Sequence, residues 1–150
     1  MQAKILVING PNLNTLGTRE PDIYGNTTLA EIEAGIRSVL GEEQIEAEFY
    51  QSNHEGDLID KLQSAGAQSD LVIVNAGALT HYGIALYDAL KAAGLPVIEV
   101  HMSNIYAREP FRSQSLLSPL AVGGIFGFGP SSYYLAARAA IDYLGRTKDR

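Results

Sequence analysis

The sequence has 150 residues, of which 46% are hydrophobic and 19% charged. We therefore expect a single folded domain of ordinary size over residues 1–150 rather than a disordered chain. The formal net charge is -6, which argues against nucleic acid as a partner because phosphate binding relies on basic residues. The absence of cysteine excludes disulfides, thiolate metal sites and a cysteine nucleophile.

Apolar runs typical of strands alternate with amphipathic patterns typical of helices. The first run, residues 3–9, is too short for a signal peptide or a membrane span, so we expect a cytoplasmic protein without membrane contact. The run LVIVN at 71–75 is continuously apolar, as in a central parallel strand covered on both faces. Strands are predicted at 3–9, 45–50, 71–75, 96–101 and 121–128, and helices at 29–40 (capped by Thr27 or Thr28, with Glu31), 57–67, 84–93 and from Ser131 or Ser132 to about 144.

This alternation predicts an α/β fold with a parallel sheet and right-handed crossovers. Five strands in this length match a flavodoxin-like three-layer sandwich with strand order 2-1-3-4-5, whose ligands sit at the carboxyl ends of the strands. Polar residues follow the first, third and fourth strands, at 9–12, 75–77 and 99–101. The sequence therefore predicts a ligand crevice at that end of the sheet.

The long connection at residues 10–25 contains a candidate general base. Arg19 lies five residues before Tyr24, and a guanidinium held against a phenol favours the phenolate. A tyrosine tuned in this way can remove a proton near neutral pH. For any one residue of this loop, including Asn12, a solvated turn is an equally good interpretation.

The fourth strand supplies a candidate acid. Glu99 and His101 are two residues apart on a strand, so their side chains point to the same face. A carboxylate beside an imidazole fixes its tautomer and stabilises the imidazolium, which suits His101 to donate a proton. The alternative is a pair that only satisfies polar groups at a strand end.

Other polar residues allow two interpretations each. Asn75 after the third strand either orients a ligand or serves as a turn residue. Arg108 and Arg112 either bind an anion or hydroxyl groups, or lie solvated on the surface. For His54, which follows the predicted edge strand, a structural or interface role is favoured.

Missing motifs narrow the chemistry further. The chain has no glycine-rich dinucleotide motif and no Walker lysine, and its three histidines form no HExxH pair, so neither a nucleotide cofactor nor a metal is expected. No lysine falls in the polar loops after the first, third or fourth strand, which argues against Schiff-base chemistry.

Taken together, the motifs NGPNLNTLGTREPDIYG, QSNHEG, NAGALTH and EVHMSNIYAREPFR resemble the type II 3-dehydroquinate dehydratases over essentially the whole chain. The resemblance implies an enzyme without cofactor or metal that eliminates water from 3-dehydroquinate to give 3-dehydroshikimate, in the shikimate pathway or in quinate breakdown. It also implies a homododecamer built from trimers.

The resemblance assigns roles to individual residues. Tyr24 would be the base, held as phenolate by Arg19 with help from Arg108. Asn12 would stabilise the enolate through a water, and His101, paired with Glu99, would protonate the departing hydroxyl. The residues that would hold the substrate hydroxyls and carboxylate are Asn75, His81, Arg112 and the backbone amides of Met102 and Ser103. Asp88 would reach the active site of a neighbouring subunit.

The chain departs from the common family pattern at positions that transfer no proton: Ala76, Gly83, Tyr87, Tyr106, Ser113 and Gln114. The rival interpretation is a flavodoxin-like small-ligand-binding or signalling module without catalysis. A receiver domain would need acidic residues after the first and third strands, where this chain has Asn9 and Asn75.

Overall fold

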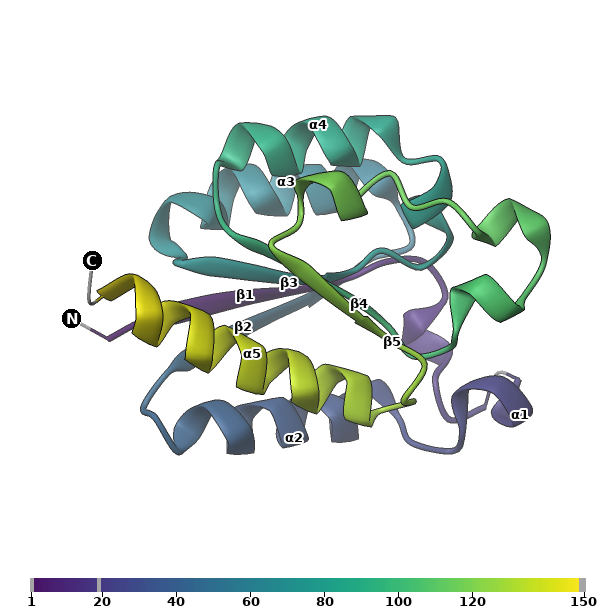
Figure 1. Cartoon of the computed structure of the whole chain (residues 1–150), viewed down its shortest axis with the longest axis horizontal. Coiled ribbons are helices and arrows are strands. Elements are labelled where there is room, and N and C mark those ends of the chain that lie inside the picture. The colour runs from purple at the N-terminus through teal and green to yellow at the C-terminus, as the bar shows by residue number, and fades with distance from the viewer. Residues whose placement is uncertain (1, 19, 149–150) are drawn as a thin grey trace.

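A parallel five-stranded sheet forms the centre of the molecule (Figure 1). The computed structural model describes residues 2–18 and 20–148. The strand order is β2-β1-β3-β4-β5 and every neighbouring pair is parallel, so the predicted order and fold class are confirmed. The strands are β1 (Lys4–Asn9), β2 (Glu46–Gln51), β3 (Leu71–Asn75), β4 (Val97–His101) and β5 (Gly123–Phe126).

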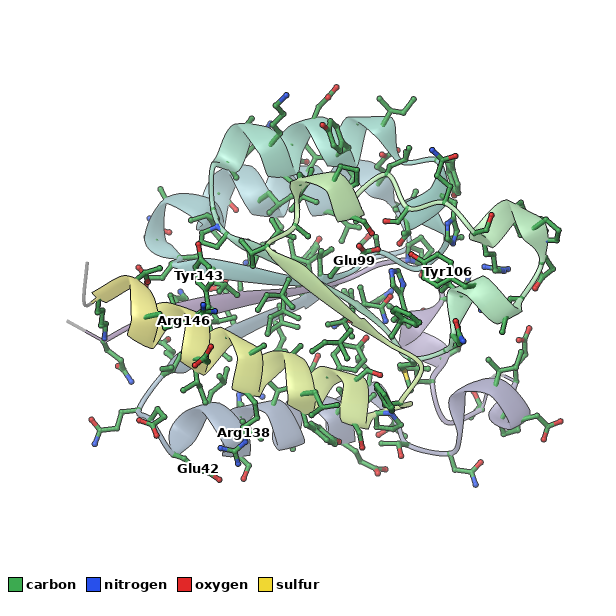
Figure 2. The ribbon with its side chains drawn as sticks, viewed as in Figure 1. Glu42, Glu99, Tyr106, Arg138, Tyr143 and Arg146 are labelled. Atoms are coloured by element: carbon green, nitrogen blue, oxygen red, sulfur yellow. The ribbon has the colours of Figure 1, made fainter. Side chains whose placement is uncertain are left out.

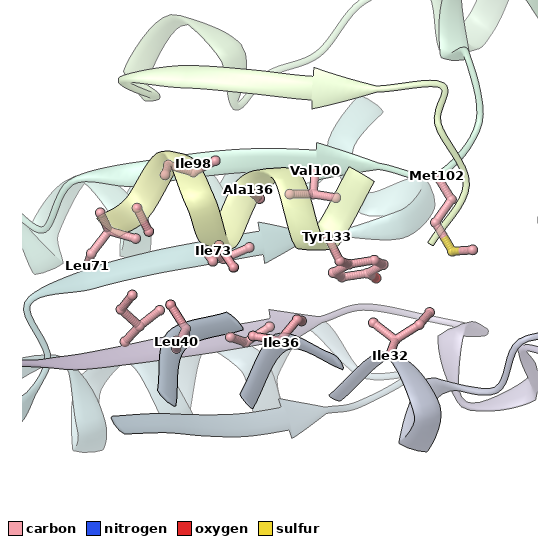
Figure 3. Close-up of a cluster of buried hydrophobic side chains, with 14 of the residues drawn as sticks. Ile32, Ile36, Leu40, Leu71, Ile73, Ile98, Val100, Met102, Tyr133 and Ala136 are labelled. Carbon is pink, nitrogen blue, oxygen red and sulfur yellow. The ribbon is translucent and has the colours of Figure 1, made fainter. Parts of the chain in front are cut away.

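Helices cover both faces of the sheet, which makes three layers (Figure 1). Helices α2 (Leu29–Gly41) and α5 (Ser131–Lys148) cover one face, and α3 (Glu55–Ala65) and α4 (Ile84–Ala93) cover the other. In β1, Ile5 and Val7 belong to the buried cluster with α2 and α5, of which Figure 3 labels Ile36, Leu40 and Tyr133. Leu6 and Ile8 belong to the cluster with α3 and α4. Both sides of the central strands are therefore buried, which explains their continuous apolar runs.

The helix starts follow local hydrogen-bonding rules. Thr28 caps α2 as predicted, because its Oγ1 accepts the backbone N–H of Glu31 at 3.2 Å. Helix α3 begins two residues before the predicted 57, since His54 is the extended N-cap residue. The His54 side chain is exposed and makes no capping hydrogen bond, so its structural or interface role stays a prediction. Helix α5 runs to Lys148, four residues beyond the predicted end.

The structure differs from the prediction at the last strand and at one short helix. The last strand spans only Gly123–Phe126 rather than 121–128. It ends at Phe126 because Gly127 takes a φ of 97°, which an extended strand does not allow. In the connection after β1, a short helix α1 (Pro21–Tyr24) was not predicted. With four residues, α1 is too short to show a helical period in the sequence.

Short 3-10 helices occupy the connections that follow β1, β3 and β4. They are η1 (Leu13–Thr15), η3 (Gly77–His81), η4 (Ile105–Ala107), η5 (Pro110–Arg112) and η6 (Ser118–Leu120); a further one, η2 (Gly66–Gln68), follows α3. The segments after β1 and β4 gather at the carboxyl ends of the strands (Figure 1). Within residues 2–18 and 20–148, no helix combines the length and the apolarity that crossing a membrane requires.

Candidate active site

A cavity of about 130 Å³ lies at the carboxyl ends of β1, β3 and β4. Just after β1 and β3 the two chains run so close together that a Cβ atom on Gly10 would collide with the backbone of Ala76. The segments that follow the three strands supply the walls. Eight of the predicted site residues line the cavity: Asn12, Asn75, His81, His101, Met102, Ser103, Arg108 and Arg112.

The predicted pair at the end of β4 is present. His101 Nε2 lies 2.5 Å from Glu99 Oε2, and both side chains are buried, with exposed fractions of 7% and 3%. His101 lines the cavity, whereas Glu99 lies behind it in β4. Figure 2 shows Glu99 toward the same end of the sheet as Tyr106. This arrangement directs Nε2 of the imidazole at the carboxylate and leaves Nδ1 for a ligand.

Two serines complete the surroundings of Glu99. The hydroxyl groups of Ser115 and Ser118 donate to its two carboxylate oxygens at 2.7 and 2.5 Å. Burial alone would raise the pKa of the Glu99 carboxyl, but hydrogen bonds from His101, Ser115 and Ser118 outweigh it and lower the pKa below the usual value. Glu99 is therefore an ionised acceptor at neutral pH.

The Asn75 amide is held in one orientation by buried partners. Its Oδ1 accepts the backbone N–H of Gly77 at 3.2 Å, and its Nδ2 donates to the Tyr133 hydroxyl at 2.8 Å. Tyr133 in turn donates to Asn9 Oδ1 at 2.7 Å. Burial raises the pKa of the Tyr133 phenol, so it stays neutral. One hydrogen of the Asn75 amide remains, so Asn75 can act as a donor to a ligand oxygen.

Asn12 adopts a left-handed backbone with a φ of 71°. Asparagine tolerates this conformation better than most residues, and such strain is common at functional sites. Its backbone N–H donates to Asn53 Oδ1 at 2.9 Å, which ties the first wall of the cavity to the segment after β2.

Two arginines from the segment after β4, Arg108 and Arg112, line the cavity, although the chain as a whole is acidic. Glu109 Oε2 pairs with Arg112 Nε at 3.2 Å and its Oε1 lies 3.7 Å from Arg108 Nε. Its own backbone amide and then Arg112 hold the pKa of the Glu109 carboxyl below its usual value. Arg108 also donates to Ser103 Oγ at 3.3 Å. The positive charge of this wall suits an anionic ligand.

His81 is oriented by a backbone group. Its Nδ1 lies 2.8 Å from the carbonyl oxygen of Gln114, so Nδ1 carries the hydrogen and Nε2 is the acceptor in the neutral ring. Because the carbonyl makes this bond, the identity of the side chain at Gln114 does not affect it. In the part of the chain that the structure describes, no group of three or more His, Asp or Glu side chains could hold a metal ion.

Comparison of the sequence with known protein families identifies one family. The family model for class II dehydroquinases matches residues 3–141. The chain belongs to the class II dehydroquinase family. It is 51% identical over 140 residues to a 3-dehydroquinate dehydratase of Prochlorococcus marinus, covering 93% of this chain and 96% of that protein. The same share of this chain is 52% identical to a 3-dehydroquinate dehydratase of Francisella tularensis subsp. novicida, of which 95% is covered.

Solved structures agree with the family assignment. A type II dehydroquinase from Butyrivibrio crossotus superimposes with a TM-score of 0.88 at 46% identity, covering 96% of this chain and 98% of that one. A 3-dehydroquinate dehydratase-like protein from Bifidobacterium longum gives a TM-score of 0.70 at 28% identity, with 96% and 99% covered.

Two of the predicted class II dehydroquinase residues are described by the structure but do not line the cavity, and two cannot be placed. Arg19 and the side chain of Tyr24 fall outside the residues that the structure describes. Glu99 acts from behind His101. Asp88 is exposed on α4, away from the cavity of its own chain.

The backbone at Ala76, where proline is usual in the class II family, has a conformation that proline could also adopt. Ala76 takes a φ of -79°, within the range that proline would impose. The sequence alone did not predict five hydrogen-bonding partners of the site residues, of which the first three are buried and the last two exposed: Tyr133, Asn9, Ser115, Asn53 and Ser118. Each acts on a site residue from a distant segment, and only the serine and asparagine residue types hint at such a role.

Replacing Tyr133 with phenylalanine should loosen the Asn75 amide. The substitution leaves Asn9 Oδ1 and Asn75 Nδ2 without their shared partner, so we expect the free energy of unfolding to fall by about 1–3 kcal/mol. Urea denaturation measures the change, and the side-chain amide signal of Asn75 in NMR spectra should move. Tyr134→Phe, on the same helix but packed against Gly35, is the control. Equal stability losses in both variants would contradict the network.

Proposed function

We propose that the chain eliminates water from 3-dehydroquinate to give 3-dehydroshikimate, through an enolate and without a cofactor or metal. The observation that supports this most is the buried Glu99–His101 pair facing a cavity with amide and guanidinium groups on its other walls. The reaction suits a single catalytic domain over residues 1–150 in the cytoplasm, in either the shikimate pathway or quinate breakdown.

On the basic side, Tyr24 removes the proton from the carbon next to the ketone. Arg19 keeps Tyr24 as the phenolate, and Arg108 assists. Asn12 stabilises the enolate oxygen through a water, since a donor placed in advance at a developing oxyanion lowers the barrier. Support comes from the position of Asn12 in the cavity wall that leads into the loop holding Arg19 and Tyr24.

On the acidic side, the His101 imidazolium gives the Nδ1 proton to the departing hydroxyl, which leaves as water. Glu99 accepts the Nε2 hydrogen throughout and stabilises the charged ring. One proton has then moved to Tyr24 and one has left His101, so exchange with solvent restores both groups. The two groups start in opposite protonation states, which their separate surroundings permit at one pH.

The remaining cavity groups bind the substrate. The backbone amides of Met102 and Ser103 receive the carboxylate, and Arg112 adds positive charge. Asn75 donates to a ring hydroxyl oxygen, and His81 offers Nε2 to a hydroxyl hydrogen.

We expect purified protein to raise the absorbance of a conjugated enone when it is given 3-dehydroquinate near neutral pH. Neither a chelator nor borohydride should reduce the rate, because no metal and no imine takes part. Circular dichroism checks that the protein is folded. Folded protein that binds 3-dehydroquinate without turnover would instead support the small-ligand-binding or signalling alternative.

The base assignment predicts that Tyr24→Phe and Arg19→Ala each lower kcat by about 100-fold or more while substrate binding persists. Turnover is followed by enone absorbance and binding by calorimetry. Tyr143→Phe, which alters an α5 tyrosine stacked under Arg146, serves as the control and should keep full activity. Normal turnover in Tyr24→Phe would remove Tyr24 as the base.

We also propose a homododecamer built from trimers, in which Asp88 reaches the active site of a neighbouring subunit. The exposure of Asp88 on α4, beside the exposed apolar side chains of Tyr82 and Ile84, supports a contact at this surface.

Mixed oligomers can test the shared site. Asp88→Asn and His101→Ala should each be nearly inactive alone. After the two are unfolded and refolded together, about a quarter of the sites would combine an intact His101 with an intact Asp88 from the next subunit. Enone absorbance should then recover accordingly, and native mass spectrometry should give the dodecamer mass. Hybrid oligomers without recovered activity would contradict a shared site.

A further inference from the structure

The carboxylate of Glu99 is held by three donors at once. Its Oε2 accepts from His101 Nε2 at 2.5 Å and from Ser115 Oγ at 2.7 Å, and its Oε1 accepts from Ser118 Oγ. Both serines belong to the segment 114–118, which lies between η5 and β5 in the sequence. With 3% of its surface exposed, Glu99 depends on these protein donors for its hydrogen bonds.

Counting hydrogens fixes the direction of the Ser115 bond. Ser115 Oγ accepts the backbone N–H groups of Leu117 and Ser118, both at 3.1 Å, which uses its two lone pairs. Only its O–H remains, and this hydrogen points at Glu99 Oε2. The serine hydrogen occupies one lone pair of Oε2, and the other lone pair accepts the hydrogen on His101 Nε2.

This restriction matters because a buried acid–base pair can hold its proton on either partner. In a poorly solvated site the neutral pair, with the proton on the carboxyl, competes with the ion pair because burying charges is costly. Hydroxyl donors to the carboxylate favour the ion pair, since hydrogen bonds to a charged acceptor are stronger than those to a neutral one. The proton then stays on the imidazole, where it is available for the reaction.

We propose that Ser115 and Ser118 are positioning residues for the dehydration, because their hydroxyl groups hold Glu99 as the acceptor that keeps His101 protonated. The inference rests on the proposed role of His101 as the acid. The serines act through Glu99 and do not line the cavity that His101 lines.

The backbone around the two serines is firmly anchored. Leu117 is fully buried in the cluster under α3 and α4, and the backbone N–H of Leu116 donates to the Thr80 carbonyl at 2.9 Å. The same segment supplies the Gln114 carbonyl that orients His81. One short segment therefore sets both histidines of the cavity.

Ser118→Ala is the cleaner test, because the Ser118 hydroxyl donates to Glu99, whereas the Ser115 oxygen also binds two backbone N–H groups. We expect kcat to fall about tenfold with KM unchanged, which is the order expected for one lost bond to a charged group. Ser118→Thr keeps a hydroxyl and should restore most of the rate. Ser64→Ala removes an exposed α3 hydroxyl that donates to the Lys61 carbonyl and should leave both constants unchanged.

A second background separates this inference from the proposed function. If Ser118 acts through Glu99, Ser118→Ala should cost less than about twofold when added to Glu99→Gln. A normal kcat in His101→Ala would overturn the acid assignment, and an unchanged kcat in Glu99→Gln would overturn the role of Glu99; either result would overturn the serine roles as well. A low kcat in Glu99→Gln together with a normal kcat in Ser118→Ala would overturn the serine roles only. The same would follow from a rise confined to KM, or from full additivity of the two substitutions.

Discussion

The close approach of β1 and β3 at their carboxyl ends fixes the position of the cavity and of the residues that line it. Gly10 must lack a side chain there, because a Cβ would collide with the backbone of Ala76. The last residues of the two strands, Asn9 and Asn75, are direct neighbours in register. The two chains stay close for two more residues, as far as Pro11 and Gly77, and both of these residues line the cavity. Helix α5 stabilises this point from one face by bringing the Tyr133 hydroxyl between the two amides.

The acid and the base of the proposed reaction belong to parts of the molecule with different constraints. His101 ends a central strand, and its orientation is set by Glu99 from the same strand and by serines from an anchored segment. Tyr24 ends a four-residue helix in the long connection after β1. With the base on a loop, substrate can enter from the side of the connection after β1. The charged groups around His101, at the end of β4, then keep their positions.

The strand order and the positions of several cavity residues could be predicted from the sequence. The strand order followed from the alternation of apolar runs and helical patterns, and the place of Asn12, Asn75 and His101 followed from the rule for parallel sheets. What could not be predicted were the contacts between distant segments. Tyr133 meets Asn75 across 58 positions and Ser118 meets Glu99 across 19, and no local period or spacing records such pairings. Short elements such as α1 escaped for a related reason, because four residues contain no repeat.

The anchored segment 114–118 has an evolutionary consequence. Because one stretch orients His81 through a carbonyl and His101 through Glu99, a change in its length or path would displace both histidines together. Substrate recognition and proton donation are thus not free to diverge independently at this part of the chain. The side chain of Gln114 can vary between relatives, because this residue contributes only its backbone carbonyl. Insertions and deletions in this segment should be selected against.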